Sequence, residues 1–201
     1  MMKPRGRHGV VLARVELETP RLRLSPARVE DTDTVFASIR ETLEPLSRWM
    51  TWCHAGYARE DAAGWIDATR AAWESDAAYE FLIRDRSDRH VGAVGLNQFD
   101  RENNGANLGY WIRQSCQRQG FAVEAVRRLA RFGLEDAQFQ RIEIVAAEGN
   151  VASRRVAERA GATFECVARN RLLIHGVPTA AAVHSFVPGA GDRPGEAGAT
   201  S

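Results

Sequence analysis

The hexapeptide Gln117-Arg118-Gln119-Gly120-Phe121-Ala122 is the most informative stretch of this chain. Residues 108–112, just before it, are rich in strand-forming types, and apolar residues of 123–139 recur at helical spacing. The hexapeptide is therefore a loop between a strand and a helix. Free backbone N–H groups and the positive end of the helix dipole meet there, and Gly120 lets the backbone approach a ligand closely. This arrangement favours a bound anion such as a pyrophosphate.

Composition narrows the class of protein. The 201 residues suit a single domain, with 44% hydrophobic and 26% charged residues and a net charge of +1. We expect one domain over 18–187, between a flexible leader (1–17) and a disordered tail (188–201). No apolar run is long enough to cross a bilayer, and the near-neutral charge argues against nucleic acid as a partner.

Cysteine and lysine usage exclude further classes. Cys53, Cys116 and Cys166 are widely spaced and form no CxxC, which fits reduced thiols in a cytoplasmic protein. Lys3 is the only lysine, which excludes a P-loop NTPase. The five histidines show no metal-ligand spacing, so no metal is expected.

Two periodicities divide the rest of the chain. Apolar alternation predicts strands at 21–24, 78–83, 90–97, 106–113, 141–147, 163–168 and 181–187. Helical spacing predicts a helix that begins at 30–33 and others over 59–73, 122–138 and 151–160, the last ended by Gly161. Hairpins precede strand–helix units, so we expect an α/β (α+β) fold, with a mixed sheet and helices on both faces.

A second loop, residues 148–153, also joins a strand to a helix. Asn150 is suited to cap that helix, and Ser153 falls in its first turn. Taken alone, these residues fit capping as well as function. Ligands of such sheets bind beyond the carboxyl ends of strands, where both loops are predicted to lie.

Taken in order, the motifs resemble the GNAT acetyltransferases of the RimJ/RimL type. The resemblance covers 18–187 and rests on 19–24, 46–52, Tyr110-Trp111, the hexapeptide, Asn150-x-x-Ser153 and Glu158-x-x-Gly161. It implies a GNAT-like mixed, mostly antiparallel central sheet, flanked by helices on both faces, with splayed strands at the cofactor cleft. It also implies acetyl-CoA as cosubstrate.

The resemblance assigns roles to individual residues. The pyrophosphate would be held by backbone N–H groups of Arg118, Gln119, Gly120, Phe121 and Ala122. The pantetheine arm would pair with Trp111, Ile112 and Arg113 like an added strand. Asn150 and Ser153 would flank the thioester as catalytic residues, and an N–H near Tyr110 would polarise the acetyl carbonyl. Gln117 completes the cofactor loop.

The general base is left open by the sequence. Many relatives carry a glutamate where this chain has Asn107, and the C-terminal aspartate and tyrosine of the group are replaced by Ala180 and His184. Glu80 on an inner strand and His184 are the alternatives, against the simpler readings of a solvated strand residue and a packing residue. Deprotonation through water is a third possibility.

The acceptor is left open as well. The expected reaction is direct attack of a primary amine, with a protein N-terminal α-amine favoured by the resemblance, and an antibiotic or polyamine as the alternative. A CoA-binding regulatory module without catalysis is the competing class. Trp49, Trp52, Trp65 and Trp73 either pack in the core or line the acceptor side. We expect a monomer or a homodimer with neither nucleic acid nor membrane as partner.

Overall fold

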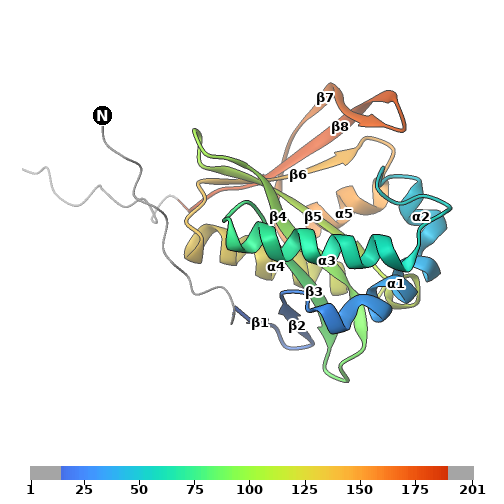
Figure 1. Ribbon diagram of the computed structural model, residues 1–201. Coiled ribbons are helices and arrows are strands. Elements are labelled where there is room, and N and C mark those ends of the chain that lie inside the picture. The colour runs from blue at the N-terminus through green and yellow to red at the C-terminus, as the bar shows by residue number, and fades with distance from the viewer. Residues whose placement is uncertain (1–14, 190–201) are drawn as a thin grey trace, which may run out of the picture.

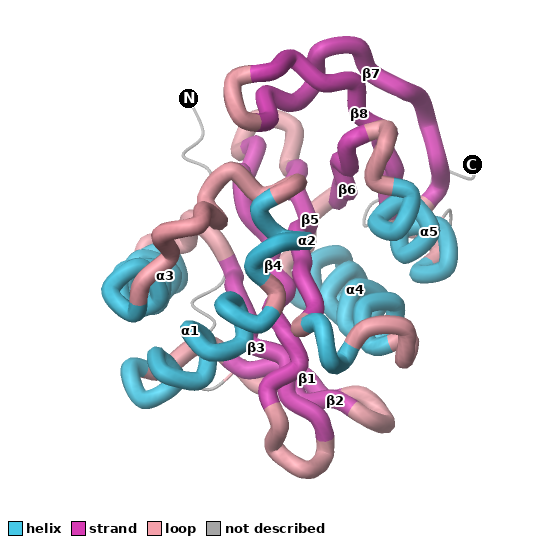
Figure 2. Tube along the Cα trace, turned by 90° about the vertical axis from the view of Figure 1, so that its right-hand side faces the viewer, coloured by secondary structure: helices cyan, strands magenta, loops and turns pink. Residues whose placement is uncertain are grey.

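One mixed sheet organises the protein. The computed structural model describes residues 15–189, so most of the predicted leader and tail lies outside the described residues. The sheet has eight strands in the order β1-β2-β3-β4-β5-β6-β8-β7, and all neighbours pair antiparallel except β5 and β6. Figures 1 and 2 show α1 and α3 on one face and α4 and α5 on the other. The expected mostly antiparallel sheet with helices on both faces is confirmed.

The strands follow the predicted order. They are β1 (Leu17–Glu18), β2 (Leu22–Ser25), β3 (Tyr79–Asp85), β4 (His90–Asp100), β5 (Gly105–Ile112), β6 (Arg141–Ala147), β7 (Thr163–Ile174) and β8 (Val177–Phe186). The last two are longer than the predicted 163–168 and 181–187. They form a hairpin whose turn, His175-Gly176, has positive φ at both residues, as a tight two-residue turn requires. Polar residues 169–171 concealed this extension in the sequence.

The helices are α1 (Thr32–Glu41), α2 (Leu43–Ser47), α3 (Arg59–Glu74), α4 (Phe121–Arg131) and α5 (Val151–Ala160), with short 3₁₀ turns at Val29–Asp31 and Gln114–Cys116. The predicted continuous helix 122–138 is wrong in its last part, because α4 passes into a π-helical turn, Phe132–Asp136. A Cβ added at Gly133 would lie 2.4 Å from Ile142 Cδ1. This glycine therefore lets the irregular turn pack closely on the sheet.

Two hydrophobic clusters fill the two faces. In β3, Phe81 and Ile83 join the cluster beneath α4, whereas Leu82 joins the cluster beneath α1 and α3. The alternation of successive side chains across a strand accounts for this division. Each face of the central strands is thus fixed in register by its own apolar residues.

The pairing of β5 with β6 is short. It covers Gly105↔Arg141, Ala106↔Ile142 and Asn107↔Glu143. Farther along, β5 remains paired with β4 as far as Ile112, and β6 with β8 as far as Ala147. The two strands therefore splay apart, and their open ends lead to α4 and α5.

Candidate active site

The loop before α4 has the geometry of an anion site. Gly120 occupies the N-cap position with φ 80°, a left-handed conformation suited to glycine, and no side chain of residues 15–189 caps this helix. Arg118 also has positive φ, at 61°. The N–H groups of the first turn of α4 are thus left for a ligand, at the positive end of an 11-residue helix.

Arg21, which the sequence did not single out, lies just before β2 and braces this loop. Its Nη1 donates to the Gln119 carbonyl at 2.9 Å, and its Nη2 lies 2.6 Å from Glu124 Oε2 in the first turn of α4. The guanidinium also lies 4.9 Å from the centre of the Phe121 ring. Although burial acts to raise it, hydrogen bonds from Thr19 and Arg21 lower the pKa of Glu124. The carboxylate is therefore charged and able to hold Arg21 in place.

A second brace ties the start of the loop to α1. Arg113 Nε and the Ser115 N–H both donate to Glu41, at 2.6 and 2.8 Å. Thr42 Oγ1 accepts the Gln114 N–H at 3.0 Å. The backbone N–H of Arg113 is paired with Val91 at 2.8 Å. The loop is thus held from both faces of the sheet.

A hydrogen-bonded group joins β5 to α5 across the splay. Asn150 Oδ1 accepts the Ser153 N–H at 3.1 Å, which confirms the predicted cap of α5. The Tyr110 hydroxyl lies 2.8 Å from Ser153 Oγ and donates to the Ser153 carbonyl at 3.0 Å. Burial raises the pKa of Tyr110 to about 12, an effect that its bond with Ser153 only partly offsets. Tyr110 is therefore protonated at neutral pH.

The residues assigned to the cofactor gather around the open end of the splayed strands. They are Tyr110, Trp111, Ile112 and Arg113 on or just after β5, Gln117, Arg118, Gln119 and Gly120 in the loop, Phe121 and Ala122 in α4, and Asn150 and Ser153 at α5. Splayed parallel strands with a helix N-terminus at each open end form a slot for an extended anionic ligand.

Comparison with known proteins agrees with this geometry. The profile described as Acetyltransferase (GNAT) domain matches residues 21–163. The chain belongs to the GNAT acetyltransferase family.

The chain is similar to several acetyltransferases of other bacteria. A Vibrio cholerae structure, provisionally described as a ribosomal-protein-serine acetyltransferase, is 34% identical with TM-score 0.75, covering 88% of this chain and 99% of that one. YdaF of Bacillus subtilis strain 168, provisionally named a ribosomal N-acetyltransferase, is 36% identical over 86 residues, 43% of this chain and 47% of that relative. The match thus spans about half of YdaF.

A third relative shares the fold. RimL, a ribosomal L7/L12 α-N-protein acetyltransferase solved in complex with coenzyme A, is 18% identical with TM-score 0.80, covering 86% of this chain and 98% of RimL. The RimJ/RimL-like fold expected for this acetyltransferase is confirmed.

Glu80 is the first alternative for the base, and it lies on the α1/α3 face of the sheet, as Leu82 does. Its Oε1 accepts from Asn97 Nδ2 at 3.0 Å, and Asn97 Oδ1 accepts from Asn107 Nδ2 at 2.9 Å. The carboxylate rests on Gly95, because a Cβ there would lie 1.8 Å from Glu80 Oε2. Burial raises the pKa of Glu80, and the bond from Asn97 partly opposes the shift. Glu80 therefore takes up a proton more readily than an exposed glutamate does.

His184, the second alternative, lies on the opposite face. It is fully buried, with its ring 5.3 Å from that of Phe164 and its Nε2 3.7 Å from Glu158 of α5. Neither ring nitrogen has a hydrogen-bond partner among the described residues. Glu80 and His184, the two alternatives for the general base of this acetyltransferase, therefore lie on opposite faces of the sheet. His184 is packed in the protein interior.

Among residues 15–189, no group of three or more histidine, cysteine or acidic side chains is placed to hold a metal ion. No helix in the same range is both long and apolar enough to span a bilayer.

Proposed function

We propose that this protein transfers the acetyl group of acetyl-CoA to a primary amine, and that the acceptor is the N-terminal α-amine of a protein. The observation that carries the proposal is the splay of β5 from β6. The loop before α4 lies at the open end of the splay, and Tyr110 is hydrogen-bonded to Ser153 across it. The ribosomal-protein acetyltransferases among the relatives support the acceptor class.

The fit of acetyl-CoA rests on the backbone. The first-turn N–H groups of α4 suit the pyrophosphate, and the edge of β5 that faces the splay suits the amide groups of pantetheine. Threading the arm along β5 away from the α4 loop brings the thioester toward Gly109. This glycine pairs with Gly95, on which the Glu80 carboxylate lies.

The two faces of the sheet then take part in different proton transfers, Glu80 on one face and the hydroxyls of Tyr110 and Ser153 on the other. The ammonium of the acceptor gives a proton to Glu80, and the neutral nitrogen attacks the thioester carbon. The C–N bond forms, the C–S bond breaks, and the departing thiolate takes a proton from the hydroxyl pair of Tyr110 and Ser153. The new amide nitrogen loses its remaining excess proton, which restores the hydroxyl pair, and Glu80 releases its proton to solvent. Both substrates bind together, so no covalent enzyme intermediate is needed.

Asn107 supports Glu80 through Asn97. It stands where many relatives carry a glutamate, and it cannot accept the proton itself. Its bond to Asn97 orients the amide that donates to Glu80. The carboxylate is thus supplied two strands away, on the same face of the sheet.

The test is acetyl-CoA turnover with a panel of peptides and small amines, read by thiol release. We expect Glu80→Gln to lower kcat/KM for the preferred amine roughly 10²-fold or more, and to remove the loss of activity on acidification that protonation of Glu80 causes. Glu102→Gln, in an exposed turn, is the control.

Each part of the proposal has its own contrary result. A Glu80→Gln enzyme with unchanged kcat/KM and pH profile would reject the base and leave the activity standing. Preference for antibiotics or polyamines over every peptide would reject the acceptor. Tight CoA binding without thiol release for any amine would identify a regulatory module.

A further inference from the structure

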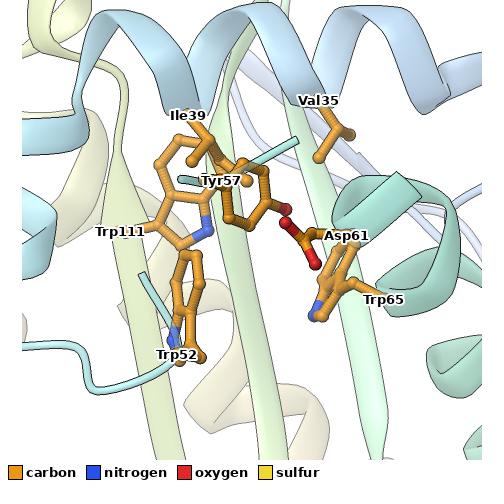
Figure 3. A pocket seen from close by; sticks show the side chains of 7 residues that line it. All are labelled: Val35, Ile39, Trp52, Tyr57, Asp61, Trp65 and Trp111. Carbon is orange, nitrogen blue, oxygen red and sulfur yellow. The ribbon is translucent and has the colours of Figure 1, made fainter. Parts of the chain in front are cut away.

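An aromatic pocket lies beside the proposed acceptor site and has no part in the reaction described above. Figure 3 shows its lining, which encloses about 210 Å³. Two aliphatic side chains of α1, four aromatic side chains and one carboxylate form the wall: Val35, Ile39, Trp52, Tyr57, Asp61, Trp65 and Trp111.

The chemistry of the lining favours a cation. Three indoles and a phenol present electron-rich faces, and Asp61 is the single anionic group among the lining residues. In Figure 3 the Tyr57 hydroxyl and the Asp61 carboxylate meet at the end of the pocket where Trp65 lies. Burial foremost, and then the charge of Asp61, raises the pKa of Tyr57 to about 12, so the phenol stays neutral. The lining therefore carries the single negative charge of Asp61.

Structural roles account for only part of this wall. Asp61 Oδ2 accepts the Ala58 N–H at 2.8 Å, which caps the start of α3, and lies 3.8 Å from His54 Nε2. Capping explains an acidic residue at this position of the helix. It does not explain the cavity, nor Trp52, which is 44% exposed although its ring meets that of Tyr57 at a centroid distance of 6.1 Å.

The pocket lies next to the site of transfer. Trp111 follows Gly109 by two residues on β5, so both face the same side of the sheet roughly 7 Å apart along the strand. The Glu80 carboxylate lies on Gly95, the partner of Gly109. An acceptor whose amine is placed at Glu80 can therefore extend a neighbouring group into the pocket.

We infer that the aromatic pocket binds an alkylammonium or guanidinium group carried by the acceptor, namely a lysine or arginine side chain close to the N-terminus of a peptide. The inference rests on the proposed function, because it identifies a feature of the acceptor. The pocket then selects peptides by a positive charge that does not itself react.

Binding can be tested without turnover, through intrinsic tryptophan fluorescence. The probes are n-butylammonium and its neutral counterpart n-pentanol. We expect the wild-type protein to bind the cation about tenfold more tightly than the alcohol, and Asp61→Asn to remove this preference. The asparagine retains an oxygen for the Ala58 N–H, so the cap of α3 is kept. Asp67→Asn, exposed on the same helix, should behave as wild type.

Two results would overturn the inference. One is equal affinity of the wild-type protein for the two probes, and the other is a cation preference that survives in Asp61→Asn. Neither depends on acetyl transfer, so failure of the proposed function leaves this test intact.

Kinetics supply the link to the acceptor. Peptides that begin Ser-Lys and Ser-norleucine differ in charge at the second residue. We expect the wild-type kcat/KM to favour the lysine peptide about tenfold, and Asp61→Asn to reduce that ratio to near one. Equal use of both peptides by an active wild-type enzyme would reject the pocket as a reader of the acceptor while confirming that the enzyme transfers acetyl groups.

Discussion

Glu80 shows how one carboxylate depends on its neighbours. Gly95 leaves the space in which the carboxylate lies, and Asn97 supplies the hydrogen bond that holds it. Neither contact is visible in the sequence, because each depends on the register of β3 against β4. The sequence named Glu80 as an alternative for the base but could not place it over a glycine. The sequence supported His184 as the base equally well. The alternation of side chains along β8 places it on the opposite face, next to α5.

His90 is a buried residue with a consequence for stability. Its Nδ1 lies 2.8 Å from Ser38 Oγ, and its ring lies 5.7 Å from that of Trp111. Burial foremost, with the charges of Arg84 and Arg113, lowers the pKa of His90 to about 3. Between that value and the usual pKa of about 6.5, the unfolded chain binds a proton that the folded protein does not. The free energy of unfolding therefore falls as the pH is lowered through this range.

We predict that the wild-type protein loses about 2 kcal/mol of unfolding free energy from this residue between pH 7 and pH 5. His90→Gln removes that contribution and flattens the pH dependence by the same amount. Urea denaturation at several pH values measures it, with His54→Gln, at an exposed position, as control. Parallel pH curves for wild type and His90→Gln would show that the histidine is protonated alike in both states.

Among the elements, the loop before α4 was the most predictable and α4 itself was predicted only in part. The strand–glycine–helix pattern is local, so sequence alone located the loop and the start of α4. The π-helical turn arises where Gly133 packs on Ile142, a contact between distant segments. The bracing of the loop by Arg21 is equally non-local, since β2 precedes α4 by about a hundred residues. Sequence spacing carries no signal for either contact.

The bracing of the loop by Arg21 leads to a prediction about cofactor affinity. Arg21→Ala removes the donor to the Gln119 carbonyl and the partner of Glu124, so the loop must be ordered when the cofactor binds. We expect the Kd for coenzyme A to rise about tenfold, the value for loss of one charge-assisted contact. Isothermal titration calorimetry measures it.

Arg23→Ala is the matched control, since Arg23 lies two residues farther along the chain, on β2, and pairs with the exposed Glu16 and Asp88. An equal Kd for wild type and Arg21→Ala would show that the loop is ordered without this brace.

In the molecule as a whole, the sheet has two sides that both border the splay between β5 and β6. Figure 2 shows α4 and α5 on one side of the sheet and α1 and α3 on the other. The first side carries the loop before α4 and the hydroxyls of Tyr110 and Ser153, and the second carries Glu80 and the aromatic pocket. Segments far apart in the chain meet above the splay, where His175 Nε2 lies 2.6 Å from the Ser47 carbonyl oxygen and the Trp49 ring lies beside Gly149. The sequence predicted the fold class and the cofactor side because their motifs are continuous. The acceptor side is assembled from several segments, so its residues could only be proposed.

We propose that the loop at Gly120 holds the pyrophosphate of acetyl-CoA for transfer to an α-amine. The most direct test is the Kd of acetyl-CoA for Gly120→Glu, a substitution that fills the loop and places a negative charge beside the phosphates. Circular dichroism establishes that the variant is folded, and mass spectrometry of a serine-initiated peptide follows transfer. We expect that the folded variant neither binds acetyl-CoA nor acetylates the peptide, whereas wild type does both. A folded Gly120→Glu protein with unchanged acetyl-CoA affinity would show that this loop does not hold the pyrophosphate.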